Sequence, residues 1–215
     1  MFPLEMSLFF LPWHSPTMET SIQQPDDITP GAWDMLQRSY ADYISNTALA
    51  YDEVLHSVAD RIRAEGSIGK SDIGALLFWK RLRADAVWVR ELMTWTDSDV
   101  REVTKLAVAA VNDTSMSVPE AASAGRRTLS PLPGFTTGDA LASALLLAAA
   151  PHRMAVYDQR AQTGLEHLGL KLSRAAGRYG RYMGLVEILR TTAKQHGQSW
   201  SARDVDVALY WLGGK

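Results

Sequence analysis

The chain has 215 residues, with 24 acidic side chains against 22 basic ones. This length suits one large domain or two small ones. The absence of cysteine excludes a disulfide framework, a thiolate zinc site, an iron–sulfur cluster and a cysteine nucleophile. Residues 1–60 carry nine acids and one base, so the remainder of the chain has a net charge of +6. This asymmetry predicts a polyanion-binding face on the body of the protein.

Residues 1–29 contain four prolines and few periodic apolar residues, so we expect a flexible N-terminal leader. Its apolar stretch, Leu8 to Trp13, is short and follows no basic residue, unlike a secretory signal. Met18 is an alternative start. The longest apolar run elsewhere, residues 140–151, is too short to span a bilayer. We therefore expect a cytoplasmic protein without a membrane partner.

From Pro30 onward, apolar residues recur at spacings of three and four, which predicts helices almost throughout. Stretches of alternating polar and apolar residues, typical of strands, are absent. The sequence therefore predicts an all-α fold, with one helical domain over residues 30–215 and a hairpin at 132–138. The expected helices lie near 33–44, 51–62, 71–80, 84–93, 100–111, 119–132, 139–151, 179–195 and 201–212.

The hairpin from Leu132 to Gly138 reads Leu-Pro-Gly-Phe-Thr-Thr-Gly and joins two predicted helices. Glycine allows close approach of the backbone to an anion, and the following helix N-terminus adds partial positive charge. We expect Arg126 and Arg127, on the preceding helix, to flank a bound phosphate. An ordinary helix–helix turn with a glycine C-cap is the alternative. The hairpin residues expected to contact DNA are Gly134, Phe135, Thr136 and Gly138.

Together with its surroundings, the hairpin resembles the helix-hairpin-helix (HhH-GPD) superfamily of DNA glycosylases. The shared pattern is a Leu-Pro-Gly hairpin, a helix rich in small residues (142–144) and an aspartate after a short apolar stretch, Ala155-Val156-Tyr157-Asp158. The resemblance is good over residues 118–160 and weaker over 70–117 and 171–215. It implies two helical lobes with a cleft between them and a double-stranded DNA partner. We expect the protein to act as a monomer.

Two departures from the family pattern refine this expectation. The hairpin glycines lie two residues further apart than usual, and the aspartate lies two residues further on, so a single two-residue insertion explains both. This alignment places Ala140 where bifunctional members carry a nucleophilic lysine. No lysine occurs between Lys105 and Lys171. The resemblance therefore implies a monofunctional glycosylase without lyase activity.

The chemistry that the resemblance implies depends on Asp158. Cleavage of the glycosidic bond passes through an oxocarbenium-like sugar, which a nearby carboxylate stabilises. The target base, whether damaged, mismatched or modified, must first be flipped out of the duplex. An abasic site remains, since strand cleavage needs an amine to form a Schiff base. Asp158 is also suited to cap a helix from Gln159 onward; the two roles are compatible, and the flanking pattern favours catalysis over capping alone.

The base pocket is expected to include Trp79, Lys80 and Tyr157, although large aromatic residues more often belong to the core. Six bases between residues 171 and 194, interleaved with Tyr179 and Tyr182, predict either a DNA-facing stripe or a solvated helix face. The five histidines show no metal-ligand spacing, so we expect no metal site. We expect no cofactor beyond a monovalent cation on the hairpin carbonyls, which the family resemblance implies.

Two other functions stay open at this point. The chain is alternatively a catalytically inactive helix-hairpin-helix DNA-binding module, or a helical protein-interaction domain in which the Pro-Gly turn is incidental. The sequence does not determine which base is excised. It also does not distinguish DNA repair from attack on foreign DNA.

Overall fold

The computed structural model describes residues 28–214, apart from the side chain of Leu49. Regular structure in this part of the chain is entirely helical, which confirms the all-α prediction. The expected leader lies almost wholly outside the described residues, as does Lys215. The helices are α1 (Pro30–Asn46), the 3₁₀ helix η1 (Leu49–Asp52), α2 (Glu53–Glu65), α3 (Lys70–Trp79), α4 (Val87–Thr94), α5 (Asp97–Asn112), α6 (Val118–Thr128), α7 (Ala140–Ala149), α8 (Gln159–His167), α9 (Arg178–Gln195) and α10 (Ala202–Leu212).

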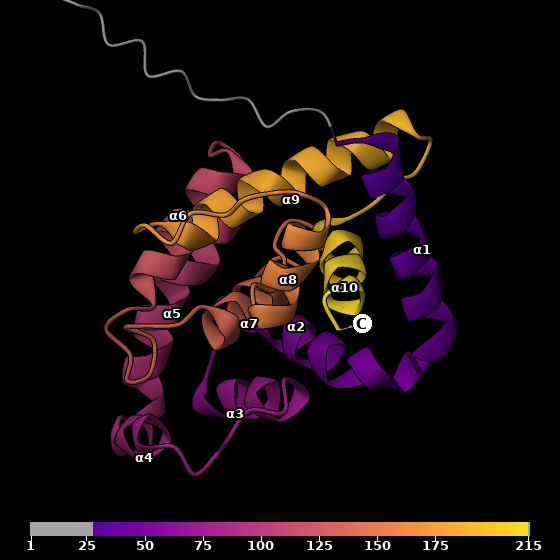
Figure 1. The fold of residues 1–215 in the computed structure, drawn as a ribbon. Coiled ribbons are helices and arrows are strands. Elements are labelled where there is room, and N and C mark those ends of the chain that lie inside the picture. Colours follow the sequence, from indigo (N-terminus) through magenta and orange to yellow (C-terminus); the bar gives the residue numbers. More distant parts are fainter. Residues whose placement is uncertain (1–27, 215) are drawn as a thin grey trace, which may run out of the picture.

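The first and last helices of the described chain pack against each other, since α1 lies along α10 (Figure 1). Helix α10 also packs on α8 and α9, and α9 crosses to contact α6, which pairs with α5. Helix α7 is apolar around its whole circumference and is buried from Ala142 to Ala148, as expected of a helix enclosed by others. It contacts α2, α3, α5 and α6. The core therefore surrounds the helix that follows the hairpin.

Several helix ends follow from local sequence signals. The Thr96 hydroxyl accepts the N–H of Asp99 at 3.1 Å and caps α5, as its Thr-Asp-Ser-Asp start predicts. Helix α3 begins earlier than expected, because the carboxylate of Asp72 accepts the N–H of Gly69 at 3.0 Å. Helix α6 ends at Thr128 rather than near residue 132, so the hairpin is preceded by a further turn.

Within residues 28–214, no helix combines the length and the apolar character needed to cross a bilayer.

Candidate functional site

Asp158 immediately precedes α8 and makes two different contacts with its two carboxylate oxygens. Oδ1 accepts the backbone N–H of Ala161 at 3.0 Å, which caps the helix. Oδ2 accepts a hydrogen bond from Lys80 Nζ at 2.6 Å, and the two side chains are only 18% and 12% exposed. The capping role that the sequence allowed is therefore present. It leaves one oxygen directed toward a cation from the end of α3.

Two buried tyrosines of α9 hold the extended segment that leads to Asp158. The hydroxyl of Tyr179 donates to the carbonyl of Ala155 at 2.9 Å, and that of Tyr182 donates to Val156 at 2.9 Å. Buried backbone groups need such partners. Burial raises the pKa of both phenols, so both stay protonated donors. The expected DNA-facing stripe is wrong for these two residues, because both are fully enclosed in the core.

Tyr157, expected in a base pocket, is a core residue instead. Its side chain is buried, its ring lies 4.9 Å from that of Tyr182, and its hydroxyl donates to Gln162 at 2.8 Å. Its backbone N–H donates to the hydroxyl of Ser143 at 2.9 Å, which joins α7 to this segment. Tyr157 therefore helps to position Asp158 and does not line the pocket described below.

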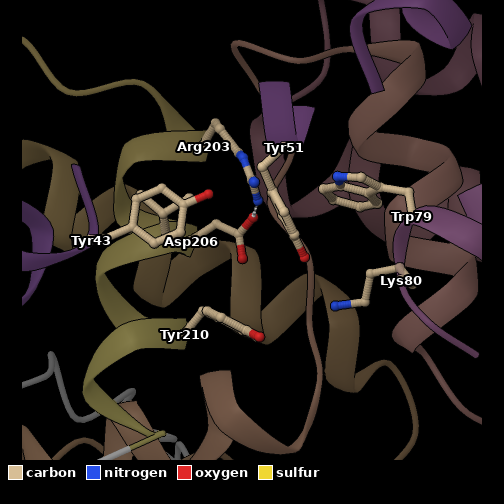
Figure 2. Close-up of a pocket in the computed structure, with 8 residues that line it drawn as sticks. Tyr43, Tyr51, Trp79, Lys80, Arg203, Asp206 and Tyr210 are labelled. Atoms are coloured by element: carbon tan, nitrogen blue, oxygen red, sulfur yellow. Dashed lines mark hydrogen bonds and ion pairs between the residues drawn. The ribbon is translucent and has the colours of Figure 1, made fainter. Parts of the chain in front are cut away.

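A narrow pocket lies between α1, η1, α10 and the C-terminal end of α3 (Figure 2). The expected pocket residues Trp79 and Lys80 both line it, and Lys80 links it to Asp158. Its cavity volume is about 20 Å³, enough for about one water molecule. A larger ligand has to displace side chains at its mouth. The lining residues are Tyr43, Tyr51, Trp79, Lys80, Arg203, Asp206, Val207 and Tyr210.

The inner end of the pocket carries a chain of charges. Arg203 contacts Asp206 and donates from Nη2 to both carboxylate oxygens of Asp52 at 3.0 Å. The indole N–H of Trp79 also donates to Asp52, at 3.1 Å. Burial raises the pKa of Asp206, while the charges of Arg203 and Lys80 lower it in part. A buried carboxylate with a perturbed pKa in a pocket is typical of functional sites.

Aromatic rings surround the ammonium of Lys80. Its Nζ lies 5.8 Å from the ring centre of Trp79 and 5.9 Å from that of Tyr210, within the range of cation–π attraction. The next residue, Arg81, has a φ of +54° and donates to the Tyr210 hydroxyl at 2.9 Å. A positive φ is uncommon outside glycine and costs energy. The chain is therefore strained immediately after Lys80.

In the hairpin, two of the expected DNA contacts are internal. The guanidinium of Arg126 donates to the carbonyls of Phe135 and Gly138 at 2.8 and 2.9 Å and pairs with Asp139 at 2.8 Å. Phe135 is buried, with its ring edge-on to Trp88 at 6.2 Å. These contacts correct the expectation that Arg126 and Phe135 face a phosphate. Both instead hold the hairpin together.

The remaining hairpin residues do lie at the surface. Thr136, Gly138 and Arg127 are exposed. A Cβ added to Gly138 would meet nothing within 4 Å, whereas one added to Gly134 would lie 2.4 Å from the ring of Trp88. Gly134 is therefore required for packing. The exposed surface of the hairpin extends from Thr136 to Gly138, next to Asp139, the N-cap of α7.

The described residues contain no cluster of three His, Asp or Glu side chains able to hold a metal ion. Two of the hairpin carbonyls on which a monovalent cation is expected, those of Phe135 and Gly138, already accept hydrogen bonds from Arg126. In the basic segment, Arg181 donates to the carbonyls of Ser173, Ala175 and Ala176. Part of the expected basic stripe is thus used to hold a loop.

Comparison of the chain with protein-family models, curated proteins and solved structures finds no match.

Sequence reasoning missed the inner wall of the pocket. Asp206 lies on the same face of α10 as Ala202, Val205 and Leu209, and all four residues are buried. A carboxylate on an otherwise apolar helix face is a signal that would have found it. Tyr43, Tyr51 and Tyr210 carry no comparable signal, because aromatic residues at helical spacing more often fill a core.

Proposed function

We propose that the protein is a monofunctional DNA N-glycosylase of the helix-hairpin-helix type, a cytoplasmic monomer with two helical lobes and the active site between them. It excises a damaged, mismatched or modified base from double-stranded DNA and leaves an abasic site. The observation that carries this proposal is Asp158. Its carboxylate is largely buried, fixed at a helix N-terminus, and joined through Lys80 to an aromatic pocket.

In the proposed reaction, the bond between the sugar C1′ and the base nitrogen breaks, and its electron pair leaves with the base. The carboxylate of Asp158 stabilises the positive charge that develops on the sugar. A water molecule then bonds to C1′ and gives up a proton, which balances the charge on the departing base. The fixed position of Asp158 supports this role, since catalytic groups work best when held in place beforehand.

Lys80 has a supporting role in this proposal. In the ion pair at 2.6 Å, its ammonium neutralises the carboxylate of Asp158 until substrate arrives. An ammonium has no lone pair, so it cannot attack the sugar until it loses a proton. Ala140, at the start of α7, offers no amine. Both facts support hydrolysis without a lyase step.

DNA binding is assigned to the exposed part of the hairpin. Backbone N–H groups near Thr136 and Gly138, together with the N-terminus of α7, suit a phosphate oxygen. Arg127 is exposed nearby, and the chain beyond residue 60 is net basic. These contacts bind the backbone without reading the base sequence. The proposed reaction needs no cofactor.

The second candidate is a helix-hairpin-helix module that binds DNA without catalysis. The cavity volume of about 20 Å³ favours it, because a flipped base needs far more space than one water molecule. The glycosylase requires the side chains at the mouth to move when DNA binds. The DNA-binding module requires no such movement.

Mass spectrometry of bases released from varied DNAs tests the proposal. Genomic, alkylated, oxidised, mismatched and modified phage DNAs are incubated with the protein and with Asp158→Asn as the matched control. We expect the unmodified protein, but not Asp158→Asn, to release a free base from at least one of these DNAs and to leave alkali-labile sites in it. Salt-dependent duplex binding without release identifies the inactive module. If the protein shows neither base release nor duplex binding, both DNA functions are contradicted and the protein-interaction domain is favoured.

A further inference from the structure

Asp206 has an unused hydrogen-bond acceptor at the inner end of the pocket. Its side chain is 4% exposed, and only Oδ2 is held by Arg203. Oδ1 has no hydrogen-bond partner among the described residues. Figure 2 shows this oxygen pointing into the space between Tyr51 and Tyr210. Among the described residues, the fully enclosed polar side-chain atoms without a partner are Ser39 Oγ, Arg178 Nε and Arg203 Nε. Asp206 Oδ1 is not one of them, so it is open to the pocket, where a donor from a ligand can reach it.

The walls around this oxygen select a flat ligand. Tyr43, Tyr51, Trp79 and Tyr210 present aromatic rings to one narrow space, and such rings stack well on heterocyclic bases. Burial raises the pKa of Tyr43 to about 12, so its phenol stays neutral at ordinary pH. A planar nitrogen heterocycle with an N–H group at its inner edge matches both the walls and the acceptor.

The two ends of the pocket fix the orientation of such a base. Lys80 lies across the space from Asp206 in Figure 2 and pairs with Asp158. If Asp158 faces the sugar, the edge of the base farthest from the glycosidic bond points toward Asp206. That edge carries the 6-substituent of a purine or the 4-substituent of a pyrimidine. An amino group there donates to Oδ1. A keto base turns its oxygen toward the carboxylate, and its own donor, the ring N–H at position 1 of a purine or 3 of a pyrimidine, lies to one side of that oxygen.

We propose that Asp206 selects 6-aminopurine and 4-aminopyrimidine bases, of the adenine or cytosine type, over their keto counterparts. The inference rests on the proposed function, because it takes the base from a flipped nucleotide whose sugar lies at Asp158. Lys80 and the hydroxyl of Tyr210 supply donors for the acceptor beside the glycosidic bond, purine N3 or pyrimidine O2. Entry of the base requires movement of Tyr51, since the cavity now holds about 20 Å³.

Matched duplexes test this inference on the full chain. Each carries one mismatched 2′-fluoro nucleotide, which resists base loss, in the pairs adenine against hypoxanthine and cytosine against uracil. Affinity is measured by fluorescence anisotropy. We expect the amino member of each pair to bind about tenfold more tightly. Asp206→Asn should abolish or reverse the preference, because an amide N–H donates to a keto oxygen.

Equal binding of both members by the unmodified protein overturns the inference, as does a preference that survives in Asp206→Asn. Thermal unfolding checks that the variant folds. If it does not fold, the unmodified protein's preference decides, and Tyr40→Phe, which removes a hydroxyl outside the pocket that binds Asp204, is expected to retain that preference. Asp158-dependent release of a keto base overturns this inference and leaves the glycosylase intact. Amino-base selectivity without release of any base supports the pocket assignment and contradicts the glycosylase.

Discussion

Lys80 and Asp158 lie 78 positions apart in the chain, yet Nζ and Oδ2 are separated by 2.6 Å. The contact joins the end of α3 to the start of α8 and brings an amine to the proposed catalytic carboxylate. In the alignment that the family resemblance implies, Ala140 takes the position of the nucleophilic lysine. The predicted absence of lyase activity therefore depends on Lys80, whose amine contacts Asp158, not attacking the sugar.

We predict that sodium borohydride traps no covalent adduct between the protein and its substrate DNA. Ala140 offers no amine, and Lys80 Nζ is engaged by Oδ2 of Asp158 at 2.6 Å, so we expect no imine with the opened sugar. Product DNA should stay intact until hot alkali cleaves the abasic site. Electrophoresis of the reaction, with and without borohydride, measures both.

The matched control is Lys80→Arg, which keeps a cation beside Asp158 and removes the amine. A borohydride adduct with the unmodified protein that disappears in Lys80→Arg would identify Lys80 as a nucleophile and end the monofunctional assignment. An adduct that persists there but is lost in Lys171→Ala would instead implicate Lys171.

The two hairpin glycines are predicted to respond differently to substitution by asparagine. Gly138→Asn should cost less than about 1 kcal/mol of stability, since asparagine tolerates positive φ and the space is open. Its side chain should lower duplex affinity about tenfold on unrelated sequences alike. Gly134→Asn should cost about 1–3 kcal/mol through its clash with Trp88. Unchanged duplex affinity in a folded Gly138→Asn would make the hairpin an incidental turn.

Removal of the Tyr182 hydroxyl should affect catalysis more than DNA binding. Tyr182→Phe leaves the buried carbonyl of Val156 without its donor, at a cost of about 1 kcal/mol in unfolding free energy. The segment before Asp158 then loosens, so turnover should fall several-fold while duplex affinity is unchanged. Tyr40→Phe, which removes a hydroxyl bound to Asp204 at 3.0 Å, is the control. Equal turnover in the two variants would contradict the positioning role.

The buried carboxyl of Asp206 should contribute a definite pH dependence to stability. Burial raises its pKa above the ordinary value of 3.8, so the folded state binds this proton more tightly than the unfolded chain does. Its contribution to stability therefore falls as pH rises from about 3.8 through the raised pKa. Urea unfolding measures the free energy of unfolding of the unmodified protein and of Asp206→Asn. As pH rises over this range, the stability of the unmodified protein should fall relative to that of the variant. A relative rise in the stability of the unmodified protein would contradict the raised pKa.

Much of the fold follows from the sequence because helical spacing and caps are local signals. The Thr96 cap, the all-helical pattern and the position of Asp158 before α8 were all predictable. Helical spacing alone predicts burial wrongly where a polar contact determines which side chain faces the core. Leu106 has the spacing of the inner face of α5 but is 60% exposed. Thr104 is buried instead, because its hydroxyl both donates to and accepts from the backbone of Ile68.

The site was less predictable, because its contacts join distant segments. Nothing in the local sequence shows that Arg203 reaches Asp52, 151 positions away. The same holds for Arg126, whose Nε, Nη1 and Nη2 each donate to the hairpin or to Asp139, which follows it. A basic side chain is available to DNA only where no nearby carbonyl or carboxylate of the protein binds it. The spacing of residues along the chain does not show which basic residues have such partners.

In the proposed reaction, the Asp158 carboxylate drives base release. Asp158→Asn keeps the shape and a competent helix cap but removes the charge. Single-turnover base release, measured on whichever DNA the unmodified protein acts upon, should fall roughly a thousandfold, with duplex affinity nearly unchanged and a lower unfolding temperature, because Lys80 loses its partner in a largely buried ion pair. Release by Asp158→Asn within a few-fold of the unmodified protein would contradict the account.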